Sequence, residues 1–131
     1  MQHLRQVKAS AGSGKTYELT RCFLQRLISS GAPGRAASPA CALVYGGPCG
    51  WGDILAVTFT NAAATEMRER VIRQLKSAAL GSPMQGLDLD PATARRWVDA
   101  IMRDMSALNI RTIDSLLHLI VRAAALELKL H

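Results

Sequence analysis

One stretch near the N-terminus carries the clearest chemistry in this sequence: Ala9-Ser10-Ala11-Gly12-Ser13-Gly14-Lys15-Thr16. Its glycines let the backbone come close to a phosphate group and turn amide N–H groups toward it. Lys15 supplies a positive charge for the β- and γ-phosphates of a nucleotide, and the hydroxyl of Thr16 is a ligand for Mg²⁺. These residue types in this order predict a phosphate-binding loop.

The flanking residues supply the expected context for such a loop. Residues Leu4 to Lys8 alternate in polarity like a short strand, and Tyr17 to Ile28 has the three- and four-residue apolar spacing of a helix. A helix that starts at the loop adds amide donors and the positive end of its dipole. The general loop pattern has glycine where Ala9 stands, so the alternative is an ordinary glycine turn beside a surface lysine.

Composition limits the classes of protein that remain. A chain of 131 residues forms one domain or less, and its net charge of +6 favours polyanionic partners such as nucleic acid or nucleotides. Cys22, Cys41 and Cys49 form no CxxC pair, which argues against a disulfide framework or a zinc site and for reduced thiols in the cytoplasm. Charged residues interrupt the longest apolar stretch, Leu116 to Leu130, so we expect no membrane span and no membrane partner.

Two further strands are predicted after the first helix. Residues 31–53 are rich in glycine and proline and form either a surface insertion or a functional lid, with a short strand possible at Cys41 to Tyr45. The apolar run Ile54 to Phe59 predicts a buried parallel strand, and Asn109 to Ile113 predicts another short strand.

Three helices are expected around these strands. Thr60 or Asn61 caps the first, which runs to about Lys76; Asp90 and Pro91 start the second; Asp114 or Ser115 caps the third, which runs to His131. Their apolar stripes are, in turn, Ala63, Met67, Val71 and Leu75; Trp97, Ile101, Met105 and Leu108; and Leu116, Leu117, Ile120, Val121 and Ala124.

Alternating strands and helices predict an α/β fold with a parallel sheet and right-handed crossovers. Ligands of such sheets bind at the carboxyl ends of the strands. The phosphate loop, Thr58 to Asn61 and Thr112 to Ser115 each follow a strand. We therefore expect all three to open onto one edge of the sheet.

Three motifs in this order resemble those of the UvrD/Rep/RecB-type superfamily 1 helicases. The loop has the form A-x-A-G-[ST]-G-K-T, residues Ala56 to Arg70 are similar to motif Ia (TFTN-x-A-A-x-E-M-x-x-R), and Arg111 to Leu116 resembles T-[FI]-[HD]-[SG]-[FL]. Asp114 makes the last motif more similar to the RecB and AddA branch than to UvrD. The resemblance covers most of the chain outside residues 32–53 and 77–89.

The resemblance implies a RecA-like P-loop NTPase fold, with residues 1–131 as the N-terminal part of helicase domain 1A, an incomplete domain. It implies ATP and Mg²⁺ as cofactors, bound by residues 9–16 with Lys15 and Thr16 catalytic. It implies a single-stranded DNA path along Thr58, Phe59, Thr60, Asn61, Thr112 and Ser115.

Several of these residues have a second interpretation. Phe59 stacks on a base or packs in the core, and Thr112 and Ser115 cap a helix with or without touching phosphate. Asp114 is expected to cap and organise hydrogen bonds, because an unpaired carboxylate beside phosphate is unfavourable. Four basic residues form either a solvated helix face, which we favour, or a DNA patch: Arg68, Arg70, Arg73 and Lys76.

The sequence has no D-E-x-x motif, no second motor domain and no arginine finger, and Gln2 and Gln6 are weak candidates to read adenine. We expect the N-terminal piece of a longer helicase that moves 3′ to 5′ on single-stranded DNA in repair or recombination, with the remaining helicase domains and a nuclease subunit or domain as partners. The alternatives are a small P-loop phosphotransferase and a non-catalytic nucleotide-binding module; a GTPase is disfavoured because no N-K-x-D motif is present.

Overall fold

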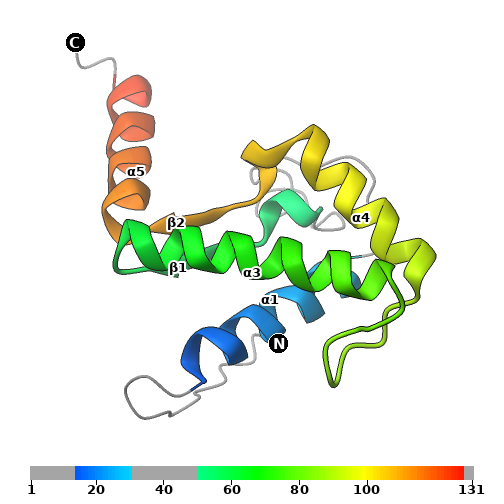
Figure 1. Ribbon diagram of the computed structural model, residues 1–131. Helices are drawn as coiled ribbons and strands as arrows, with labels where there is room; N and C mark the ends of the chain where they lie inside the picture. Colours follow the sequence, from blue (N-terminus) through cyan, green and yellow to red (C-terminus); the bar gives the residue numbers. More distant parts are fainter. Residues whose placement is uncertain (1–13, 31–49, 129–131) are drawn as a thin grey trace, which may run out of the picture.

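The computed structural model describes residues 14–30 and 50–128 (Figure 1). The described elements, in chain order, are α1 (Lys15–Ser29), the 3₁₀ helix η1 (Trp51–Asp53), β1 (Ala56–Thr58), α3 (Asn61–Ala79), α4 (Pro91–Arg103), η2 (Met105–Ala107), β2 (Ile110–Thr112) and α5 (Ile113–Glu127). The strands predicted at residues 4–8 and 41–45 lie outside the described residues.

The two described strands are parallel, as the sequence predicts. Ala56 lies opposite Ile110 and Thr58 lies opposite Thr112, so the carboxyl ends of β1 and β2 are level. Helix α3 packs against both strands. The prediction of a buried strand over Ile54 to Phe59 is confirmed only in part: Ala56 is buried but Val57 is 36% exposed, because α3 covers only the face to which Ala56 points.

Helix α3 is the central element of the described fold. The hydroxyl of its N-cap, Thr60, accepts the N–H of Ala63 at 3.1 Å, which satisfies one of the free amides of the first turn. Met67, Val71 and Leu75 are buried as their four-residue spacing predicts, whereas Ala63 is only half-buried. The helix runs to Ala79, three residues beyond the predicted end.

Helices α1 and α4 both pack on α3 and complete the core (Figure 1). Asp90 caps α4 by accepting the N–H of Thr93 at 2.9 Å, and Pro91 occupies the first turn, as predicted. The ring of Trp97 meets that of Trp51 edge to face, with centroids 6.3 Å apart. The predicted apolar stripe of α4 ends at Ile101. Met105 lies beyond the end of the helix and is exposed, and Leu108 is buried but also lies outside the helix.

Helix α5 departs from its prediction in two ways. Its N-cap is Thr112, whose hydroxyl accepts the N–H of Ser115 at 3.2 Å, so the assignment of Asp114 or Ser115 as the cap is wrong. Its expected buried face is also wrong: no residue of the helix is buried, and Ile120 and Val121 are 55% and 65% exposed. Figure 1 shows why, since α5 rises away from the other helices and contacts the sheet only near its start.

No helix among residues 14–30 and 50–128 has both the length and the apolar character needed to cross a membrane.

Candidate functional site

The first turn of α1 carries the described end of the predicted phosphate loop. Gly14 has φ 75°, a left-handed conformation that favours glycine, and its carbonyl oxygen accepts the N–H of Glu18 at 2.8 Å. Lys15 follows as the first helical residue, and its side chain is exposed. Residues 9–13 of the loop lie outside the described residues. The structure thus places Lys15 at a helix N-terminus, where free amides and the helix dipole favour an anion.

Thr16 and the residues after it form hydrogen bonds within α1. Thr16 is half-buried, and its carbonyl oxygen accepts the hydroxyl of the buried Thr20 at 2.7 Å. Glu18 binds Arg21 through two side-chain hydrogen bonds of 2.5 and 2.9 Å. The hydrogen bond and the charge of Glu18 raise the pKa of the Arg21 guanidinium, so this residue stays positively charged.

A small hollow between α1 and α3 adjoins the same turn. Sequence reasoning missed it, because its walls come from segments that meet only in the folded chain. The hollow is lined by Tyr17, Thr20, Arg70, Arg73, Gln74 and Met84. Its arginines bring positive charge close to the start of α1.

The ends of the two strands form a second group of candidate residues. The hydroxyl of Thr58 lies 3.1 Å from the carbonyl oxygen of Thr60 and 3.4 Å from that of Arg111 on the neighbouring strand. This bridge joins the end of β1 to the end of β2. The level register brings the predicted segments 58–61 and 112–115 side by side.

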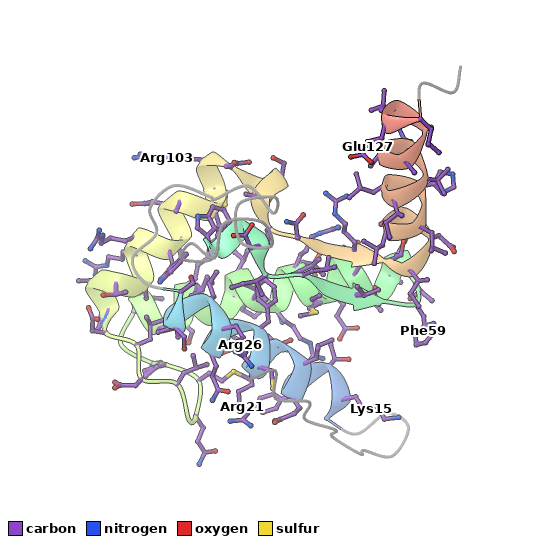
Figure 2. All side chains as sticks on the ribbon, turned by 180° about the vertical axis from the view of Figure 1, so that it is seen from behind. Lys15, Arg21, Arg26, Phe59, Arg103 and Glu127 are labelled. Carbon is purple, nitrogen blue, oxygen red and sulfur yellow. The ribbon has the colours of Figure 1, made fainter. Side chains whose placement is uncertain are left out.

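Phe59 lies at this edge with 86% of its surface exposed, so its ring does not pack in the described core. Figure 2 shows the side chain pointing outward, toward the same end of the molecule as Lys15. Asn61 and Thr60 are both exposed, and the Thr60 hydroxyl accepts the capping hydrogen bond from Ala63. An exposed aromatic ring beside an exposed amide side chain and an exposed threonine is a surface suited to a stacked base and a phosphate.

The second segment is more constrained by its capping role. Thr112 is 7% exposed and its hydroxyl already accepts the N–H of Ser115. Ser115 is exposed, with its hydroxyl donating to the Thr112 carbonyl oxygen at 3.1 Å. Asp114 is exposed in the first turn of α5, and its carbonyl oxygen lies 3.3 Å from Nδ1 of His118. Ser115 is therefore the more accessible of the two candidate contacts.

The basic residues of α3 do not form one uniform face. Arg73 and Lys76 are exposed, in agreement with a solvated surface, and Arg70 pairs with Glu66 at 2.7 Å. Arg68 differs, because it is half-buried and its Nη2 donates to the carbonyl oxygen of Ile110 in β2. The expectation of a solvated residue is wrong for Arg68.

Comparison with known proteins relates the whole chain to one group. A family model described as the UvrD/REP helicase N-terminal domain matches residues 1–131. The RecBCD enzyme subunit RecB of Escherichia coli is 30% identical over 97% of this chain, and an ATP-dependent helicase/nuclease subunit of Lactobacillus gasseri is 31% identical over 83% of it. The ATP-dependent DNA helicase UvrD1 of Mycobacterium tuberculosis is 42% identical over half of the chain.

The matched region is a small part of each relative. It spans 11% of RecB, 7% of the Lactobacillus helicase/nuclease protein and 6% of UvrD1. No solved structure gives a significant match. Because the family model covers the full sequence, this chain belongs to the UvrD/REP helicase family and corresponds to its N-terminal domain.

Proposed function

We propose that this chain is the N-terminal part of domain 1A, the ATP-binding motor domain of an ATP-dependent DNA helicase, with a RecA-like P-loop fold. The observation that carries the proposal is the match of the whole chain to the N-terminal helicase domain. The described geometry supports it. Lys15 is the first residue of a helix, and the two predicted DNA segments lie at the carboxyl ends of two strands that end level with each other.

Residues 9–16 bind the phosphates of ATP in this proposal. Lys15 is exposed at the start of α1, where its charge reaches the β- and γ-phosphates and offsets the charge that develops during phosphoryl transfer. The Thr16 hydroxyl is a hard oxygen donor of the type that Mg²⁺ prefers, and the ion would neutralise the phosphate oxygens when bound. Thr16 is held at this position through the bond from Thr20 to its backbone.

Single-stranded DNA crosses the edge formed by the strand ends. Thr60, Asn61 and Ser115 contact the phosphate backbone, Phe59 stacks on a base, and Thr58 and Thr112 hold the two segments in place. Backbone contacts and stacking carry little sequence information, as expected for a motor that must move along any strand.

The longer protein would hydrolyse ATP between two motor domains and step 3′ to 5′ along the strand, in DNA repair or recombination. The names of two relatives point toward a nuclease-linked assembly: one belongs to the RecBCD enzyme and the other is named as a helicase/nuclease. The remaining helicase domains and a nuclease subunit or domain are therefore the proposed partners.

The test of nucleotide binding uses Lys15→Ala and a matched control. Arg26→Ala removes one exposed positive charge from the last turn of the same helix, away from Lys15 (Figure 2). We expect Lys15→Ala to lose most of the affinity for a fluorescent ATP analogue in the presence of Mg²⁺, while Arg26→Ala binds like the unmodified chain. Equal loss in both variants, or none in either, contradicts the assignment.

The test of DNA binding uses a fluorescent oligothymidine. Asn61→Ala is expected to weaken binding, whereas Thr65→Ala, an exposed position one turn further along α3, leaves it unchanged. Affinity must also fall steeply with added salt, because each phosphate contact releases counterions. ATP binding without any single-stranded DNA binding would favour a nucleotide-binding module of another kind.

A further inference from the structure

Arg68 is held differently from the other basic residues of α3. Its Nη2 donates to the carbonyl oxygen of Ile110, which lies 42 residues away in β2, and the side chain is half-buried. Ile110 itself is fully buried. A guanidinium that reaches across to a strand backbone fixes the position of that strand relative to the helix.

The carbonyl oxygen of Ile110 faces the edge of β2 that β1 does not use. The carbonyl oxygen of Asn109 accepts the N–H of Ala56 at 2.9 Å, and that of Arg111 lies 3.4 Å from the Thr58 hydroxyl. Alternate residues of a strand direct their backbone groups to opposite edges, so the Ile110 carbonyl points outward. Arg68 therefore holds β2 from one edge while β1 holds it from the other.

This arrangement links the two proposed DNA segments. Ile110 is two residues before Thr112, whose hydroxyl fixes Ser115, and Arg68 lies on the helix that begins directly after Thr60. We propose that Arg68 is a positioning residue for single-stranded DNA: it fixes the spacing between segments 58–61 and 112–115 so that one strand can contact both. The inference rests on the proposed DNA-binding function.

In this proposal the charge of Arg68 points into the fold and does not contact phosphate. This difference can be tested by the salt dependence of DNA binding. A lysine or arginine that contacts phosphate directly releases counterions, and its removal lowers the salt slope of single-strand binding by about 0.7. A residue that only positions other contacts changes the affinity by a similar factor at every salt concentration. The slope therefore separates a positioning role from a direct contact.

The experiment measures the affinity of the chain for oligothymidine over a range of salt concentrations. Arg68→Met removes the donor and keeps much of the side-chain length. We expect a loss of roughly two- to thirtyfold, the range for residues that modulate a site without touching its ligand, at an unchanged salt slope. Arg68→Lys keeps a charged donor group and is expected to retain part of the affinity that Arg68→Met loses. Amide hydrogen exchange should become faster at Ser115, but not at Ala63, whose N–H is capped separately.

Two controls separate this role from charge and from stability. Lys76→Met removes an exposed charge from the same helix and is expected to leave DNA affinity nearly unchanged. Leu75→Ala lowers stability at the contact of α3 with Val98 and Ile101 and should leave DNA binding intact at low temperature. The proposal is overturned by unchanged affinity in Arg68→Met, by a salt slope reduced by about 0.7, or by an equal loss in Leu75→Ala. Absence of binding by the unmodified chain counts instead against the proposed DNA function.

Discussion

The exposed ring of Phe59 argues against the core role that the sequence left open for it, and base stacking stays a prediction. A ring that is 86% exposed contributes little to the core, so Phe59→Ala is expected to leave the melting temperature nearly unchanged. Loss of a stacked base should reduce the free energy of DNA binding by roughly 1–3 kcal/mol. Oligothymidine titration and thermal melting of the same samples test both expectations.

Phe23 offers a matched control within the chain. This phenylalanine is 4% exposed in α1, so Phe23→Ala is expected to cost roughly 3–5 kcal/mol of stability. If Phe59→Ala destabilises the chain as strongly as Phe23→Ala does, its ring packs against something in solution and the stacking role is wrong.

Capping residues show how far single residues can be assigned from the sequence. Asp90 was predicted correctly, and Thr60 is one of the two caps that the sequence left open beside Asn61, because each stands directly before a clear helical pattern. Thr112, Asp114 and Ser115 are all residue types that can cap, and the chain uses the first, in extended conformation at the end of β2. The choice depends on where the strand ends, which is set by pairing with β1 and not by the local sequence.

At the scale of the element, the start of α4 should respond to pH. Hydrogen bonds from Thr93, first from its side chain and then from its backbone, lower the pKa of the Asp90 carboxyl. A lowered pKa means that the contribution of Asp90 to stability is complete above the ordinary carboxyl value near 4 and is lost as pH falls through the folded value.

Asp90→Asn isolates this effect, because the amide oxygen can still cap but does not titrate in this range. We expect the stability advantage of the unmodified chain over this variant to shrink as pH is lowered from 7 to 3, measured by urea unfolding. An advantage that grows toward low pH would contradict the sign of the pKa shift.

Helical periodicity predicted two elements with different success. The stripe of α3 is buried where predicted at Met67, Val71 and Leu75, because α1, α4 and the strands all pack on this helix. The stripe of α5 is equally regular, yet Leu117 is 54% exposed. Periodicity predicts that a helix forms and which side is apolar, but burial also requires a neighbouring element on that side.

At the scale of the whole molecule, the chain should bind ATP without efficient turnover. The sequence has no D-E-x-x motif and no second motor domain to supply an arginine finger, so the groups that stabilise the transferring phosphoryl are missing from these 131 residues. Phosphate release is expected to stay far below the roughly 10 per second of a typical enzyme, with or without DNA. Turnover at a helicase-like rate would show that the catalytic machinery is complete here.

Among the described residues, the parallel pairing of β1 with β2, the order of the helices and strands and the shared edge of these two strand ends were predictable, because strand and helix patterns alternate clearly in the sequence. The contact between Arg68 and Ile110 and the hollow beside Tyr17 were not. Both join segments more than forty residues apart, and no local pattern indicates which side chain will reach which backbone group.

The outward position of α5 has a calorimetric consequence. The heat capacity change of unfolding reflects mainly the apolar surface that becomes hydrated, and 131 residues of ordinary burial would give about 1.6–2.0 kcal/mol/K. Side chains such as Ile120, Val121 and Leu126 are already more than half exposed in the folded chain. Their hydration changes little on melting, so scanning calorimetry should give a heat capacity increment below this range, and a correspondingly flatter dependence of stability on temperature.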